Sequence, residues 1–186
     1  MKKLTALLSL ALALPLAAQE PPMPQPTAEH HKLAEQIGTW DAVIEMTGPD
    51  GTPMKEKGVS RRQMPMGPFW LHDQFQSEFM GMKFKGHGTT GYDPHKKKYV
   101  GTWIDSMTPT LMVTEGNWDK TGKVLTMVGM GVDMQGKPAR HRFVTTVENR
   151  DAHTFEMFVG PEGKDVKMMT IHYTRRVPKR DTTGGR

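Results

Sequence analysis

The residues best suited to bind a small molecule lie in one short segment, from Tyr99 to Asp105. Alternate side chains of a β-strand point to the same face, so Trp103 and Asp105 share a face there. If that face lines an enclosed interior, a ring and a carboxylate converge in one cavity, as in small-molecule sites. The alternative is that Trp103 is ordinary core and Asp105 begins the turn before Pro109. Neighbouring segments add further groups, and the candidate ligand-binding residues are Trp103, Asp105, His87, Tyr92 and Glu115.

Catalysis by a nucleophile has little support in the sequence. Asp105 and Ser106 are adjacent, and one of His72, His87 or His95 could complete a hydrolase set. The strained G-x-S-x-G turn that exposes a nucleophilic serine is not present, however. No H-x-H or H-E-x-x-H element indicates zinc either. We therefore predict no catalytic residues, no cofactor and no enzymatic activity.

Methionine is unusually frequent, with sixteen residues, and cysteine is absent. Thioethers are soft ligands that select Cu(I), so closely spaced methionines give a copper carrier as an alternative function. The simpler interpretation is that methionine replaces leucine as an adaptable filler of the core or of a pocket. The candidate copper ligands of the alternative are Met64, Met66, Met80 and Met82.

The N-terminus has the pattern of a secretory signal. Lys2 and Lys3 precede the apolar run Leu4–Leu16, which is followed by the small residues Ala17 and Ala18. The run is shorter than the roughly 20 residues that cross a bilayer. We expect export to the periplasm or the medium, with 1–18 as signal peptide, 19–26 as Pro-rich linker, 27–178 as one domain and 179–186 as a disordered tail.

Short strands are predicted for nearly all of that domain. Every second residue from Trp40 to Met46 is apolar, while Asp41 and Glu45 share the other face. Turns rich in Gly, Pro, Asn and Asp separate further runs, and only Ala28–Ile37 suggests a helix. The fold class is all-β, an up-and-down antiparallel barrel of eight to ten strands. The further runs are 52–65, 69–79, 82–91, 98–106, 110–118, 123–134, 138–148, 153–160 and 165–177.

The segment Gly38-Thr39-Trp40 resembles the G-x-W entry of lipocalin-type barrels. The resemblance implies that Trp40 closes one end of the barrel under a late-strand arginine, Arg175 or Arg176. A longer similarity, over Met23 to Val177, is to the exported bacterial family called domain of unknown function 1579. It implies a lipocalin-like barrel and no particular activity. Its motifs are His30-His31-Lys32-Leu33, Gly38-Thr39-Trp40, Gly91-Tyr92-Asp93, Tyr99–Met107 and Tyr173-Thr174-Arg175.

The charge distribution limits the classes of binding partner that we expect. The formal charge of +5 falls by two without Lys2 and Lys3, and the basic residues form no long stripe with interleaved aromatics. We therefore expect no nucleic acid and, after cleavage of the signal, no membrane. The leading hypothesis is a carrier of a small, largely apolar molecule. A structural or interaction protein with a filled barrel, forming a homodimer through an apolar sheet face, remains a further alternative.

Overall fold

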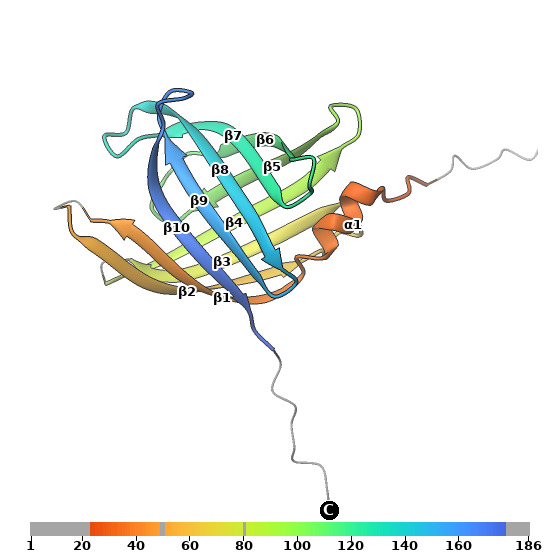
Figure 1. The fold of residues 1–186 in the computed structure, drawn as a ribbon, viewed down its shortest axis with the longest axis horizontal. Coiled ribbons are helices and arrows are strands. Elements are labelled where there is room, and N and C mark those ends of the chain that lie inside the picture. Colours follow the sequence, from red (N-terminus) through yellow and green to blue (C-terminus); the bar gives the residue numbers. More distant parts are fainter. Residues whose placement is uncertain (1–22, 49–50, 80, 178–186) are drawn as a thin grey trace, which may run out of the picture.

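The computed structural model describes residues 23–48, 51–79 and 81–177. These form one short helix and a closed barrel of ten strands (Figure 1). The predicted signal peptide and C-terminal tail lie outside the described residues. The elements are α1 (Ala28–Ala34), β1 (Gly38–Thr47), β2 (Pro53–Gln63), β3 (Trp70–Phe79), β4 (Met82–Asp93), β5 (Lys98–Asp105), β6 (Met112–Trp118), β7 (Val124–Val132), β8 (Pro138–Asn149), β9 (Ala152–Val159) and β10 (Val166–Arg175).

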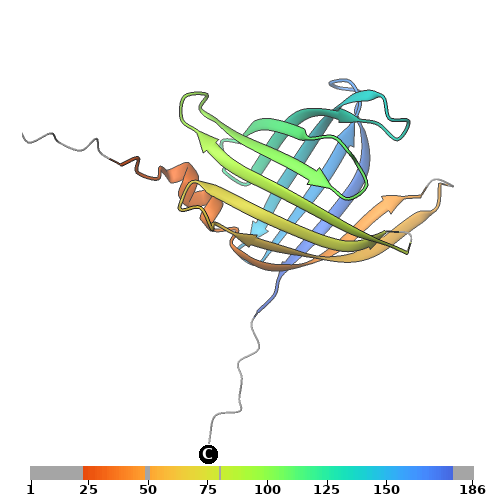
Figure 2. The same cartoon turned by 180° about the vertical axis from the view of Figure 1, so that it is seen from behind.

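Every strand pairs antiparallel with its neighbours in the chain, and β10 pairs with β1 to close the sheet (Figures 1 and 2). The predicted up-and-down barrel is therefore confirmed, with ten strands. Short turns make this meander possible. In the turn after β6, for example, the Asp119 carboxylate accepts hydrogen bonds from the backbone N–H groups of Lys123 and Val124, at 3.0 and 3.1 Å. Gly122 has a positive φ of 69°, which favours glycine.

The helix covers one end of the barrel, which we call the closed end. Leu33 of α1 is 1% exposed and packs among side chains of the barrel interior, namely Leu71, Tyr99, Leu125 and Met127. The backbone N–H of Thr27 donates to His30 Nδ1 at 3.0 Å and so caps the first turn. The helix ends at Ala34 rather than at the predicted Ile37, because hydrogen-bonded turns follow it.

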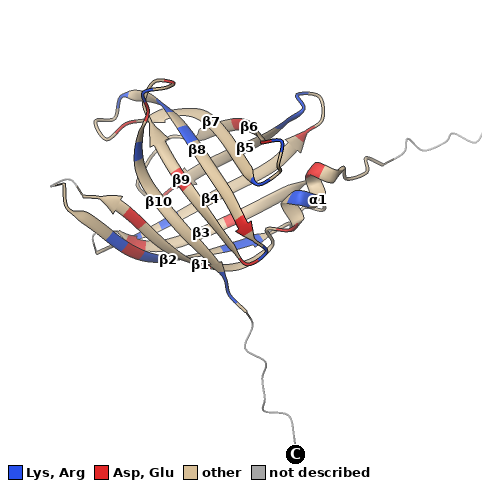
Figure 3. Ribbon diagram, in the orientation of Figure 1, with Lys and Arg blue, Asp and Glu red and all other residues tan. Residues whose placement is uncertain are grey.

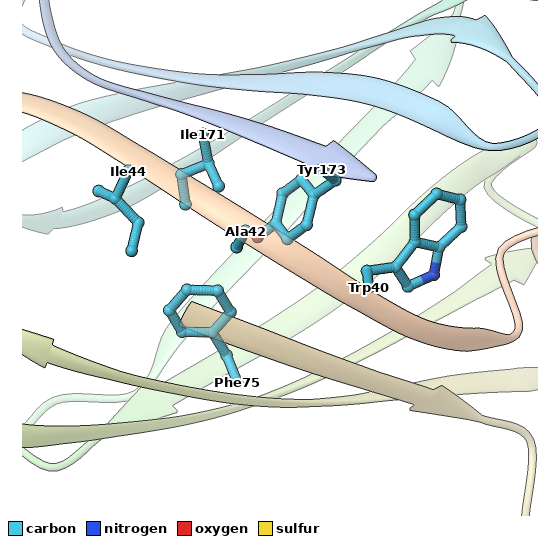
Figure 4. Close-up of a cluster of buried hydrophobic side chains, with 6 residues drawn as sticks. All are labelled: Trp40, Ala42, Ile44, Phe75, Ile171 and Tyr173. Atoms are coloured by element: carbon cyan, nitrogen blue, oxygen red, sulfur yellow. The ribbon is translucent and has the colours of Figure 1, made fainter. Parts of the chain in front are cut away.

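A cluster of buried side chains fills part of the interior near that end. Figure 4 shows its six members on the inner side of the wall. The register explains the gathering, since residues directly opposite in neighbouring strands share a face. Ala42 lies opposite Tyr173, and Ile44 lies opposite Ile171. The members are Trp40, Ala42, Ile44, Phe75, Ile171 and Tyr173.

Trp40 and Arg175 close the barrel as predicted. The Arg175 guanidinium carbon lies 4.1 Å from the centroid of the Trp40 ring. Arg175 also donates to the carbonyl oxygens of Glu35 and Ile37, which follow α1. The Trp40 indole N–H donates to the Gln36 carbonyl at 3.0 Å. These contacts hold the segment between α1 and β1 against the last strand.

We expect Arg175→Ala to lower the free energy of unfolding by about 1–3 kcal/mol, since it removes a cation–π contact and hydrogen bonds from a charged donor. Urea denaturation followed by circular dichroism measures the change. The matched control is Arg176→Ala. Arg176 pairs with exposed Asp41, so its loss should change stability by less than about 1 kcal/mol. Equal effects of the two variants would contradict a closing role for Arg175.

Strand β7 presents its more apolar face outward. Met130 is 60% exposed and lies opposite Val113, which is also exposed. The inward side has two larger residues, Leu125 and Met127, followed by two glycines, Gly129 and Gly131. Charged residues of both signs are interspersed along the wall and its turns (Figure 3). No helix among residues 23–48, 51–79 and 81–177 is long and apolar enough to cross a membrane.

Candidate functional site

The candidate site is the part of the barrel interior that lies away from α1, toward the end that we call the open end. Water can reach an inward side chain of a closed barrel only where the wall or an end is open, and α1 covers the closed end. Several inward side chains nevertheless remain partly exposed. We call this set the lumen. Its apolar residues are Met46, Met54, Phe84, Trp103, Met112, Phe143, Phe155, Met157 and Met169, and the carboxylate residue Glu56 shares the inner face opposite Ile44.

One wall of the lumen is a continuous row of methionines. Going from β2 through β1 and β10 to β9, each residue of the row lies directly opposite the next, in the order Met54, Met46, Met169 and Met157. Phe143 of β8 lies opposite Met157 and continues the row. Opposed side chains in adjacent strands have Cβ atoms about 4.5–5.5 Å apart, so these thioethers are neighbours. Methionine is flexible and polarisable, and such a wall adapts to ligands of different shapes.

Trp103 lies against two inward glycines of β4. A Cβ on Gly86 would fall 2.1 Å from the ring, and one on Gly88 would fall 3.1 Å from it. The indole N–H donates to Asp105 at 3.0 Å. The same carboxylate accepts from the backbone N–H groups of Met107 and Thr108, at 2.9 and 2.8 Å. Both residues therefore face inward as predicted, and Asp105 also begins the turn that the alternative described.

Two of the predicted lumen residues face outward, so that prediction was wrong for them. His87 lies opposite Ile104 on the outer surface, where its ring is 5.7 Å from that of His72. Glu115 lies opposite Val100 and pairs with Lys98 at 2.6 Å, and this hydrogen bond lowers the pKa of Glu115. Register decides both placements, because Gly88 rather than His87 is opposite Trp103, and Thr114 rather than Glu115 is opposite inward Gly101.

Tyr92 faces inward but lies at the closed end, beyond the lumen. Its ring centroid is 5.2 Å from that of Tyr99, and burial raises the pKa of Tyr99 to about 12. Both tyrosines border a hollow of about 410 Å³ between α1, the β4–β5 turn and β6. Lys32 and Trp118 also line this hollow, and the Lys32 ammonium lies 4.2 Å from the centroid of the Trp118 ring.

A buried polar cluster lies on the inner face near the closed end, and the sequence analysis missed it. Arg62 donates to Asp73 at 3.0 Å and to Ser60 at 3.1 Å, and Ser60 donates to Asp73 at 2.6 Å. A second nitrogen of Arg62 lies 3.0 Å from His153 Nε2. Burial, and then the charges of Arg62 and Arg175, lower the pKa of His153 to about 3. The only signal in the sequence was that Ser60 and Arg62 share a face of one strand.

The three described methionines among the predicted copper ligands do not converge on one point. Met64 and Met66 follow β2 at the closed end, where Met64 packs against the Leu33 cluster. Met82 begins β4 at the open end. Strand β3 separates these positions, and ten residues of strand span about 30 Å. Met80 lies outside the described residues, and in the remaining described chain no three His, Asp or Glu side chains gather as a metal site.

Several solved structures resemble this barrel. The crystal structure of Rv2717c from M. tuberculosis matches with a TM-score of 0.62 at 11% sequence identity, covering 82% of this chain and 100% of that chain. The S-type phycobiliprotein lyase CPES from Guillardia theta matches with a TM-score of 0.54 at 12% identity, covering 83% and 100%. At such identities the likeness shows the fold alone.

The sequence itself matches one family model. The model is described as "Protein of unknown function (DUF1579)", and the match covers residues 25–175, from the segment before α1 to the end of β10. No curated protein matches the chain.

Proposed function

The chain belongs to the DUF1579 family, and from that premise we propose that it is an exported carrier that binds a small, largely apolar molecule without transforming it. The ligand lies in the lumen and enters through the open end. The N-terminal pattern of Lys2, Lys3 and the run Leu4–Leu16 supports export to the periplasm or the medium.

The observation that carries this proposal is the partly exposed apolar wall. In a barrel whose interior is completely filled, inward methionines and aromatic rings are buried. Here Met46, Met157 and Met169 face inward and yet remain accessible. Apolar concave surfaces with few polar groups are typical of small-molecule sites, and burying such surface in a ligand contact stabilises the complex.

Binding without chemistry is supported by the state of two inward carboxylates. Asp105 accepts three hydrogen bonds from its surroundings, and Asp73 is paired with Arg62 and Ser60. A general base must reach the proton that it removes, and groups held in this way are poorly placed for that task. A copper carrier built on Met64, Met66, Met80 and Met82 lacks support, because the described members of that set lie at opposite ends of β3.

Native mass spectrometry of the protein purified from an exporting host tests the proposal. We expect a chain that begins at Gln19 and carries an additional organic mass that is lost on denaturation. A chain retaining Met1 would contradict export. A polypeptide without bound mass, as monomer or as dimer, would contradict a carrier and favour an interaction role.

Substitutions inside and outside the barrel should then differ in their effect on binding. The fluorescent apolar probe N-phenyl-1-naphthylamine should bind the unmodified protein, and Met157→Lys should weaken binding at least about tenfold because it places a charge in the apolar lumen. Met130→Lys is the matched control, since Met130 is on the outer face and 60% exposed. Fluorescence titration measures both. Equal affinities would place the probe outside the barrel.

A further inference from the structure

His141 of β8 has a buried ring nitrogen without a hydrogen-bond partner. His141 is only 6% exposed, and its Nε2 lies 3.0 Å from the carbonyl oxygen of Val132. A carbonyl only accepts hydrogen bonds, so Nε2 carries the proton and Nδ1 of the neutral ring presents a lone pair. That Nδ1 is buried and has no hydrogen-bond partner. Buried polar atoms are nearly always paired, and an unpaired one calls for an explanation.

The position of the ring connects this atom to the lumen. His141 lies on the inner face of β8, opposite Gly129 of β7 and Val159 of β9. A Cβ on Gly131 would fall 2.9 Å from Nε2 and 3.0 Å from Cδ2. That edge of the ring therefore packs on β7, and the edge with Nδ1 faces away from β7. The ring centroid is 5.9 Å from that of Phe143, a lumen residue.

The side chain beside His141 is one that a ligand could displace. A Cβ on Gly131 would also fall 2.5 Å from the terminal methyl of Met112, so this thioether and the imidazole share the space over the glycine. Methionine changes rotamer at low cost. Met112 is partly exposed in the lumen, so its movement would widen the space beside the ring.

We propose that His141 Nδ1 is the polar anchor of the lumen and accepts a hydrogen bond from the hydroxyl group of an otherwise apolar ligand. This inference rests on the proposed carrier function and adds the chemical class of the cargo. An ionised carboxylate offers only acceptors and cannot donate to the lone pair. The inward cation Arg62 is already paired with Asp73 near the closed end, so it does not supply an alternative site for an acid. The proposed cargo is therefore an apolar molecule with a hydroxyl group, for which a long-chain alcohol is a simple probe.

The test compares three ligands of one chain length at pH 8, where dodecanoate is ionised: 1-dodecanol, dodecyl methyl ether and dodecanoate. Each displaces N-phenyl-1-naphthylamine from the unmodified protein in a fluorescence competition. We expect the alcohol to bind about fivefold tighter than the ether, because it makes one additional buried hydrogen bond. The alcohol should also bind tighter than the acid. Equal affinities for alcohol and ether, or a preference for the acid, would overturn the assignment. Failure of the probe itself to bind would instead contradict the carrier function.

Two variants assign the preference to one atom. His141→Leu should bind alcohol and ether equally, while His172→Leu, a change on the exposed outer face of β10, should keep the preference. A preference that survives in His141→Leu would overturn the proposal. If the His141→Leu variant does not fold, a measurement on the unmodified protein tests the same assignment. The ¹⁵N resonance of His141 Nδ1 in the unmodified protein should shift with dodecanol and not with the ether, and an unchanged resonance would also overturn the proposal.

Discussion

Replacing Arg62 by alanine is expected to lower the free energy of unfolding by about 3–5 kcal/mol, the range for breaking a buried ion pair. Arg62 is 7% exposed and contacts Asp73, Ser60, His153 and Gln36. Its removal leaves the Asp73 carboxylate in the barrel interior without a cation. Chemical denaturation measures the change.

The neighbouring residue provides the control for this prediction. Arg61 is exposed on the opposite face of β2, so Arg61→Ala should change stability by less than about 1 kcal/mol. A double variant separates charge from packing. When both partners become apolar, as in Arg62→Met with Asp73→Leu, no unpaired charge remains, and part of the loss should be recovered. If Arg62→Ala were as stable as Arg61→Ala, the cluster would not contribute to stability.

The second large effect is the loss of stability in acid caused by His153. The ring is 5% exposed, and burial followed by the charges of Arg62 and Arg175 lowers its pKa to about 3 from an ordinary value of 6.5. Between these values the unfolded chain binds a proton that the folded ring does not. This contribution to stability is therefore complete above pH 6.5. It falls by up to about 1.4 kcal/mol per pH unit as the pH is lowered toward 3.

Urea denaturation at several pH values between 7 and 4.5 checks this sign and slope. The variant His153→Gln retains an amide acceptor for Arg62 but cannot titrate, so its stability should depend less on pH over this range. Parallel curves for His153→Gln and the unmodified protein would show that the ring titrates normally.

The strands could be predicted from the sequence because their signals are local. Alternation and turn residues located every strand to within about two or three residues at each end, including the late strand that carries Arg175. The Trp40–Arg175 contact was predicted from a resemblance rather than from periodicity, and the structure confirms it for Arg175.

The predictions that were wrong or missing depend on the register between strands, which is not a local property of the sequence. Alternation puts two residues on one face without telling which face is inside, and β7 shows the consequence, since exposed Met130 belongs to its more apolar face. A shift of one residue moves a side chain through the wall. For this reason His87 was assigned to the lumen, and the pairing of Arg62 with Asp73 was not foreseen.

The seam between β1 and β10 has a consequence for the order of assembly. It joins residues 40–46 to residues 169–175, so the sheet cannot close until nearly all of the domain has left the ribosome. Until then β1 has an unpaired edge, and so does the last strand formed. Such edges recruit strands from other molecules, and contacts between distant residues form slowly. Chains truncated before β10 are therefore the forms of this protein that should aggregate, and a chaperone that shields strand edges would help its synthesis.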